Sequence, residues 1–236
     1  KELNVEAFTL VPLTKEEQID FLVKFWGIYE NEEGKKFANE LIDKHFRFME
    51  DYSTPNLTAL PPQLRMFAEI YAEKVKSGNF ESIELNFFEL FEKFIEKKIE
   101  ILAKEKGKLG EDVTFKQEFY KVHHFYALKH LLQYDEYEDI FCSSYDKEKW
   151  PAEDLVRCGI LRIENGKFYF IHQTFAEFFL ANFLKDELKI GKTLKAKFVK
   201  IFWKIFLDDK FIIVRKFLND VIEQVELKKI KKVEMN

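Results

Sequence analysis

The sequence contains little glycine, proline and cysteine, and each scarcity excludes a class of protein. Eight glycines and five prolines in 236 residues argue against a β-sandwich and against a disordered low-complexity chain, and they favour helices. The two cysteines, Cys142 and Cys158, are too few for a disulfide framework and predict a reduced, cytoplasmic setting. We therefore expect a mainly α protein in the cytoplasm.

The sequence also lacks an excess of one charge and a long apolar run. Its 38 basic and 42 acidic residues give a net charge of −4, so there is no basic footprint for nucleic acid and we expect no such partner. No apolar run approaches the roughly 20 residues of a membrane span, so we expect no membrane partner. The chain begins at Lys1 without a Met or a signal-peptide pattern, and we interpret it as a piece of a longer protein.

A phosphate-binding loop is missing as well. Gly191-Lys192-Thr193 is the nearest match to a Walker A loop, but Asp186 stands where that loop needs a glycine, and a helix rather than a strand precedes it. No GxGxxG occurs either. We therefore expect no self-sufficient nucleotide site and no enzymatic activity within this segment.

The remaining chemistry-bearing residues do not form a metal site or a nucleophile site. His123, His124 and His130 fall on one predicted helix, without the further ligands that zinc requires. We interpret them as polar positions on an amphipathic helix. Neither cysteine has a neighbouring base at motif spacing.

What the sequence does contain is a succession of amphipathic helices. Residues 1–79 predict a lone strand near residues 5–10 followed by a bundle of three helices. A capping box at Thr14 and Glu17 opens the first helix, and Pro61-Pro62 opens the third, because proline is favourable in a first helical turn. The first helix is predicted to bury one side, made of Ile19, Leu22, Val23, Trp26 and Tyr29. The second and third helices are predicted over residues 35–49 and 63–76.

The pattern changes after residue 79. Helices are predicted over residues 86–106, 112–133 and 151–158, followed by a hairpin with strands 160–163 and 168–171. Asn165-Gly166 lies between these strands, and Asn-Gly between apolar runs favours a type I′ turn. Further helices are predicted over residues 173–184, 194–207 and 211–227.

The segment Phe168–Leu184 reads FYFIHQTFAEFFLANFL. It resembles the end of the winged-helix module in STAND ATPases of the NACHT class, the NOD-like receptor group. Their pattern, roughly F-x-H-x-x-F-x-E-F/Y-F-x-A, is matched by Phe170, His172, Phe175, Glu177, Phe178, Phe179 and Ala181. The resemblance implies a helical domain 1 over residues 1–79, a winged-helix domain over residues 80–185 and the start of a second helical domain over residues 186–236.

Two earlier motifs extend the resemblance. The stretch from Thr58 to Met66 looks like the family motif in which a proline packs against the adenine ring, which implies that role for Pro61, with Pro62 as the other possibility. Val11–Gln18 is similar to the family's L-x-P-L-T-x-E-x-Q entry into helical domain 1. A simple helix-initiating proline is the alternative interpretation of Pro61.

The resemblance also implies a function. In NACHT proteins the histidine that corresponds to His172 donates a hydrogen bond to the β-phosphate of ADP and locks a closed, inactive arrangement. We therefore expect ADP or ATP as the cofactor, held by the nucleotide-binding domain of the same parent chain and contacted by His172 and Pro61. The segment would then be a regulatory arm that controls autoinhibition and homo-oligomerisation in innate immune signalling.

Three alternatives remain open at this point. His172 could be satisfied by local backbone groups and play only a structural part. The chain could be a winged-helix DNA-binding protein, although Glu153 and Asp154 beside a single Arg157 suit a DNA-binding helix poorly. It could also be a purely helical scaffold for protein interactions.

Overall fold

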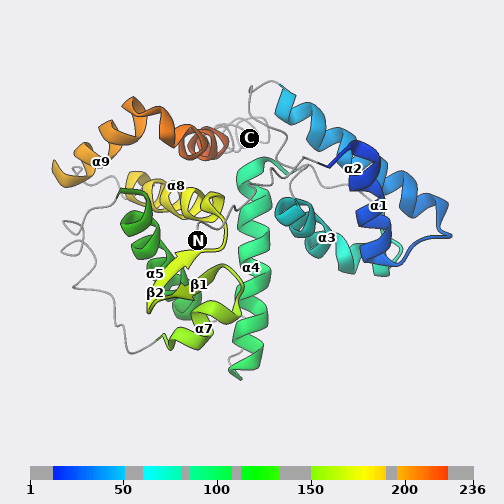
Figure 1. Ribbon diagram of the computed structural model, residues 1–236, viewed down its shortest axis with the longest axis horizontal. Coiled ribbons are helices and arrows are strands. Elements are labelled where there is room, and N and C mark those ends of the chain that lie inside the picture. Colours follow the sequence, from blue (N-terminus) through cyan, green and yellow to red (C-terminus); the bar gives the residue numbers. More distant parts are fainter. Residues whose placement is uncertain are drawn as a thin grey trace, which may run out of the picture. The chain divides into compact units, whose positions relative to one another are not determined.

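The computed structural model describes six stretches of the chain: residues 13–50, 61–80, 85–107, 113–132, 150–189 and 196–222. They are mainly helical, as the composition predicted, and they include one small antiparallel sheet of two strands (Figure 1). The strand expected at residues 5–10, Cys142 and Gly191-Lys192-Thr193 lie outside the described residues. Residue contacts divide the chain into two compact units, residues 1–84 and 85–236.

The first unit is the predicted three-helix bundle. Its helices are α1 (Lys15–Trp26), α2 (Glu32–Glu50) and α3 (Pro61–Lys76), and α1 packs against both others. The core is lined by Leu22, Phe37, Ala38, Leu41, Ile42, Leu64, Phe67, Ala68 and Tyr71. The indole N–H of Trp26 donates to the carbonyl of Ala68 over 2.9 Å, which ties α1 to α3.

Helix α1 begins where the capping box predicted and ends earlier than expected. The Thr14 N–H donates to the Glu17 carboxylate over 2.8 Å, and the Glu17 N–H donates to the Thr14 hydroxyl over 3.2 Å. Gly27 has a φ of 68°, the left-handed conformation that closes a helix at glycine. The expectation that Tyr29 lies on the buried side is wrong: Tyr29 is 57% exposed, because it lies beyond the end of the helix.

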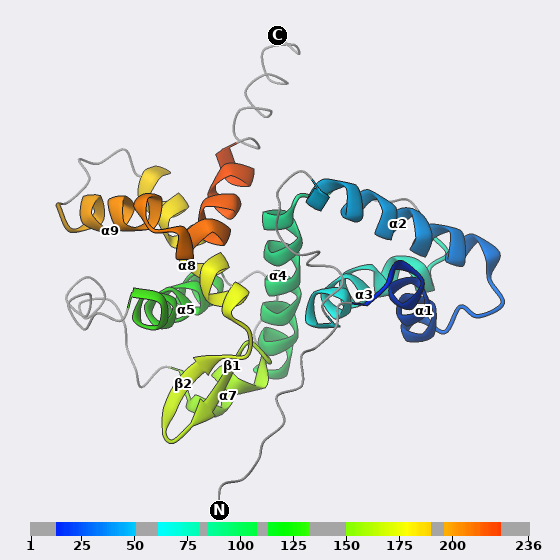
Figure 2. The same ribbon diagram turned by 45° about the horizontal axis from the view of Figure 1, so that its top comes forward.

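The second unit contains the other helices and the sheet (Figure 2). Its elements are α4 (Phe87–Glu105), α5 (Val113–Leu132), α7 (Ala152–Arg157), β1 (Leu161–Glu164), β2 (Lys167–Phe170), α8 (Gln173–Lys189), α9 (Ala196–Leu207) and the short 3-10 helix η4 (Asp209–Phe211). Residues 212–222 are helical as well. Helices α5 and α8 share the most extensive helix–helix contact, and α9 lies beside α8. Nowhere in the described stretches is a helix both long enough and apolar enough to cross a bilayer.

Phenylalanines make the centre of this second unit. The ring of Phe217 is stacked on Phe87 with a centroid distance of 4.5 Å, and it lies 5.2 Å from Phe91 and 5.6 Å from Phe178. These rings come from the helix at residues 212–222, from α4 and from α8. The last described helix therefore shares one core with the elements between residues 85 and 189.

The predicted hairpin is present with the predicted turn. Asn165 and Gly166 have φ angles of 51° and 71°, the two positive values that a type I′ turn requires. Glu164 pairs with Lys167 next to the turn, and Leu161 pairs with Phe170 at the open end. The loop holds only two residues, so β1 ends and β2 begins directly beside it. Each strand is therefore shifted by one residue toward the turn, compared with the predicted ranges 160–163 and 168–171.

Candidate functional site

His172 lies at the corner between β2 and α8. The Ile171 N–H donates to the carbonyl of Ile160 over 3.0 Å, which extends the hairpin by one pair, and α8 begins two residues later. His172 takes the N-cap position: its ring Nδ1 accepts from the Thr174 N–H over 3.2 Å, and its carbonyl accepts from the Phe175 N–H over 3.1 Å. The strand fixes the backbone of His172 and the cap fixes its ring.

The cap also determines which ring nitrogen can donate. Because Nδ1 accepts a hydrogen bond, the proton of the neutral imidazole sits on Nε2. Burial lowers the pKa of His172 below its usual value of 6.5, so the ring is neutral at pH 7. The side chain is only partly buried and is not sealed beneath other residues. The corner thus holds one oriented N–H donor in a partly exposed position.

The other residues of the motif are buried and pack against the rest of the second unit. Phe175 lies 5.5 Å from Phe91, and Phe178 lies 5.0 Å from Phe88, both on α4. Phe179 contacts α5 through His123, with ring centroids 4.7 Å apart. These aromatic positions therefore form the core that holds the start of α8 in place.

Glu177 is the buried acid of the same motif. It is 4% exposed, and burial raises the pKa of its carboxyl, while a hydrogen bond from the Gln173 side chain over 2.8 Å acts in the opposite direction. Glu177 is a core residue that joins the first two turns of α8.

The histidines of α5 correct the sequence analysis. His123 and His124 are 0% and 5% exposed, so their interpretation as polar surface positions is wrong; His130 is exposed, as expected. The reason is that α5 is covered on several sides, by α4, α8 and β2. In the part of the chain that the structure describes, no three His, Cys, Asp or Glu side chains are arranged to hold a metal ion.

Pro61 is exposed and is the first residue of α3, which begins two residues earlier than predicted. Pro61 belongs to the first unit and His172 to the second, so the position of each residue is described only within its own unit. Sequence reasoning missed the neighbouring Gln63, which is 2% exposed and whose side-chain oxygen Oε1 has no hydrogen-bond partner among the described residues. The sequence signal that could have drawn attention to Gln63 was its place at the third position of a helix, where a capping box has Glu or Gln.

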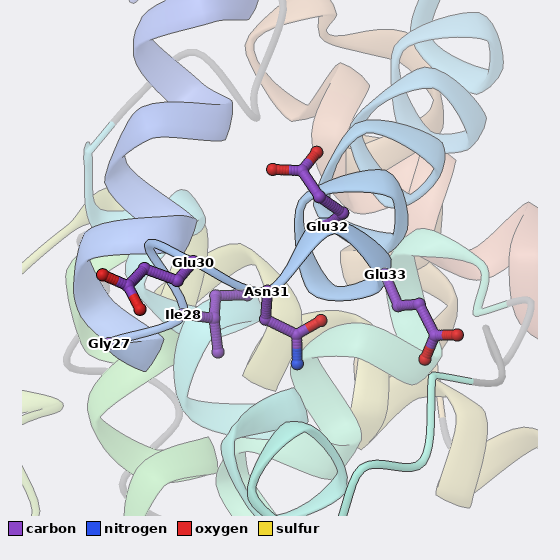
Figure 3. Close-up of a pocket in the computed structure, with 6 residues that line it drawn as sticks. All are labelled: Gly27, Ile28, Glu30, Asn31, Glu32 and Glu33. Atoms are coloured by element: carbon purple, nitrogen blue, oxygen red, sulfur yellow. The ribbon is translucent and has the colours of Figure 1, made fainter.

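An open hollow of about 630 Å³ lies at the turn between α1 and α2 (Figure 3). It is lined by Gly27, Ile28, Glu30, Asn31, Glu32 and Glu33. The three carboxylates point in different directions, and the Glu32 carboxylate already pairs with the Lys35 ammonium at 2.7 Å. The hollow therefore lacks a convergent set of ligands.

The two arginines of the α7 and hairpin region are paired with acids. Arg157, the one basic residue of α7, lies 3.3 Å from the carboxylate of Glu105, and Arg162 on β1 lies 3.3 Å from that of Glu164. Paired arginines contribute little positive potential, so this observation disfavours binding of α7 to DNA phosphates.

Cys158 is a structural thiol. It is buried, it donates to the carbonyl of Leu155, and burial raises its pKa to about 11. Since the thiolate is the reactive form, this cysteine is not a candidate nucleophile.

Comparison of the chain with protein-family models, with curated proteins and with solved structures gave no match.

Proposed function

We propose that this chain is the regulatory arm of a NACHT-type signalling ATPase. In this proposal residues 1–79 are helical domain 1, residues 80–185 are a winged-helix domain and the following helices begin a second helical domain. The succession of α5, α7, hairpin and α8 supports the winged-helix assignment. The arm contacts ADP or ATP held by the nucleotide-binding domain of the same parent protein. The nucleotide then controls autoinhibition and homo-oligomerisation, in innate immune signalling within the cytoplasm.

The observation that carries the proposal is the position of His172. The phenylalanines of the motif are buried, whereas the ring of His172 is partly exposed and is capped so that Nε2 carries the proton. A donor held in this way can reach a phosphate oxygen on another domain without first losing side-chain freedom. The cap thus prepares the ring for a ligand that it does not hold alone.

The energy available from such a contact is enough for a switch. A hydrogen bond from an imidazole N–H to an anionic oxygen contributes about 1.5–3 kcal/mol. Every 1.4 kcal/mol changes an equilibrium constant by about tenfold. Loss of the contact would therefore move the equilibrium between closed and open arms by about one to two orders of magnitude toward the open form.

The test replaces His172 in the full-length protein. His172→Leu removes both the N–H donor and the helix cap. His172→Asn keeps a good N-cap residue, but its side chain is too short to make the contact that the imidazole Nε2 makes. We expect both variants to oligomerise spontaneously and to lose about 10- to 100-fold in affinity for ADP. Lys167→Ala, an exposed change on β2, should leave both quantities at the wild-type level. Light scattering and quantification of co-purified nucleotide provide the two measurements.

The two substitutions separate a phosphate contact from a purely structural cap. If His172→Asn behaves as wild type while His172→Leu lowers the melting temperature, the histidine serves α8 alone. Wild-type oligomerisation and ADP content in both variants would likewise refute the proposal.

A further inference from the structure

Helix α9 has two apolar sides, and only one of them is buried. The side chains that pack into the second unit are those of Phe198, Ile201 and Ile205. Another side of the helix exposes four large apolar side chains, which we call the α9 outer face: Val199, Trp203, Phe206 and Leu207. They follow the spacing i, i+4, i+7 and i+8, which places them on one face of a helix. Trp203 is 62% and Leu207 76% exposed, and a contiguous apolar face of this kind marks a binding surface.

The α9 outer face is held in place by the rest of the unit. Figure 1 shows α9 at the edge of the second unit, beside α8. The guanidinium of Arg215 donates to the carbonyls of Ile205 and Asp208 over 2.9 Å each, which satisfies backbone acceptors at the end of α9. The rings of Phe202 and Phe206 are stacked with centroids 4.8 Å apart. A ligand therefore meets a face that is already formed, and little ordering is needed to bind it.

The charge of α9 has one sign. Its charged residues are Lys197, Lys200 and Lys204, and it contains no acidic residue. Lys200 and Lys204 are one turn apart and form a row along the helix, next to the row of Trp203 and Leu207. Apolar side chains and ammonium groups thus lie next to each other, so the fitting partner combines an apolar phase with negative charge.

This combination favours a lipid surface over a protein. Protein–protein interfaces are enriched in arginine and depleted of lysine, and α9 has three lysines and no arginine. A second copy of the same face would bring its own lysines into the contact, where like charges repel. In an anionic bilayer, by contrast, tryptophan and leucine enter the boundary of the acyl chains while lysines extend to the phosphates.

We propose that the α9 outer face binds an anionic membrane surface, with α9 lying in the plane of the interface. The 12 residues of α9 are fewer than the roughly 20 that a membrane span needs. The expectation of no membrane partner came from the absence of a spanning run, and a helix that lies on the surface needs no such run. The proposal does not depend on the contact of His172 with a nucleotide.

The first experiment uses Trp203 as its own reporter. The 236-residue chain is titrated with vesicles of phosphatidylcholine alone and with vesicles of equal parts phosphatidylcholine and phosphatidylserine. We expect the tryptophan emission to move to shorter wavelength with the anionic vesicles, because an exposed indole enters an apolar environment. Trp203→Phe should remove this shift and still float with the same vesicles, since Trp150 is buried and does not report on the surface.

A second experiment compares variants of the α9 outer face with matched controls. Leu207→Gln should weaken binding to the anionic vesicles by about tenfold, the effect of one leucine that no longer enters the apolar phase. Lys200→Gln should weaken it by about fivefold, as expected for one lysine at an anionic surface. The controls are Ile101→Gln on α4 and Lys121→Gln on α5, which are also exposed and should bind as the wild type does. Circular dichroism should show the wild-type fold in all four variants.

Three results would overturn the proposal. The first is the absence of a wavelength shift, or controls that weaken binding as much as Leu207→Gln and Lys200→Gln do. The second is self-association of the 236-residue chain that Leu207→Gln abolishes, seen in sedimentation without vesicles, because the face would then bind a second copy. The third is a full-length protein that does not float with anionic vesicles although the 236-residue chain does, because another part of the parent protein would then cover the face.

Discussion

His123 occupies an aromatic sandwich inside the second unit. Its ring is stacked between Phe119, at a centroid distance of 4.0 Å, and Phe179, at 4.7 Å. Nδ1–H donates to the Phe119 carbonyl over 2.8 Å, while Nε2 has no partner among the described residues. The adjacent His124 bonds to the side chain of Asn182 over 3.0 Å. Burial lowers the pKa of His123 to about 4 and that of His124 to about 3, so both rings are neutral in the folded protein.

These two histidines should make the chain sensitive to mild acid. In the unfolded chain a histidine takes up its proton near pH 6.5, but the folded chain cannot protonate these rings until about pH 4 and pH 3. The unfolded state therefore binds more protons as the pH falls below 6.5, and the free energy of unfolding decreases. Each histidine contributes at most about 1.4 kcal/mol per pH unit, and the loss from His123 levels off near pH 4. Urea unfolding between pH 7.5 and pH 4 measures this slope.

The variant His123→Phe measures how much of the pH dependence of the free energy of unfolding comes from His123. The phenylalanine keeps the stacking between two rings and removes an unpaired nitrogen, although the bond to the Phe119 carbonyl is lost. We expect nearly unchanged stability at pH 7.5 and a slope smaller by about one proton. Replacement of His130, which is exposed, should leave most of the slope of unfolding free energy against pH unchanged. A slope that His123→Phe does not reduce would show that other groups cause the acid sensitivity.

At the scale of elements, α4 is capped from two sides. Its own Asn86 accepts from the Glu89 N–H over 2.8 Å. The carboxylate of Asp220, on the helix at residues 212–222, accepts from the Phe88 N–H over 3.1 Å, and its carbonyl accepts from the Asn86 side chain over 3.4 Å. A negative charge at a helix N-terminus is also favourable for the helix dipole. The second cap therefore ties the last described helix to the start of α4.

Asp220→Ala should consequently destabilise the protein. The Phe88 N–H would be left buried without an acceptor, at a cost of about 1–3 kcal/mol. Asp220→Asn keeps an oxygen acceptor and should cost less than half as much, which makes it the matched control. Urea denaturation followed by circular dichroism measures both. Equal losses in the two variants would mean that the charge, not the hydrogen bond, stabilises α4.

Local sequence patterns predicted the secondary-structure elements well, but they did not predict the contacts between those elements. Thr14 with Glu17 and Asn165 with Gly166 act within four residues, and both features are confirmed. Asn86 and Glu89 spell the same kind of capping box, so local reasoning could have found it. The bond from Phe88 to Asp220 spans 132 residues, and no local signal predicts a cap supplied from that distance.

In the candidate site, too, local sequence motifs were predictive and long-range contacts were not. His172 was placed at the end of the hairpin from the local motif, and the structure puts it at that corner; its contact with a nucleotide stays a prediction. The burial of His123 and His124 was missed because it depends on the elements that cover α5, not on the spacing of residues within it. The unpaired oxygen of Gln63 was missed for a similar reason, since only coordinates show which donors surround a side chain.

On the scale of the whole molecule, the two units have separate cores. Phe37 in the first unit is 2% exposed and lies against Trp26, Tyr71 and Phe80, with centroid distances of 5.9, 5.6 and 5.8 Å. Phe217 in the second unit is 0% exposed and is surrounded by phenylalanines of that unit. Each of these rings thus stabilises the unit that contains it, which predicts that the units can open independently.

Truncation of one ring per unit tests this independence. Phe37→Ala and Phe217→Ala should each cost about 3–5 kcal/mol, as is usual for a buried phenylalanine, and hydrogen exchange reports where the cost falls. We expect Phe37→Ala to accelerate exchange in α1, α2 and α3 by a factor of 100 or more, on the order that this energy implies, and to leave α4, α5 and α8 protected. Phe217→Ala should do the reverse. If either variant accelerated exchange equally in all six helices, the chain would open as one cooperative body, because a loss in one core would then be transmitted fully to the other.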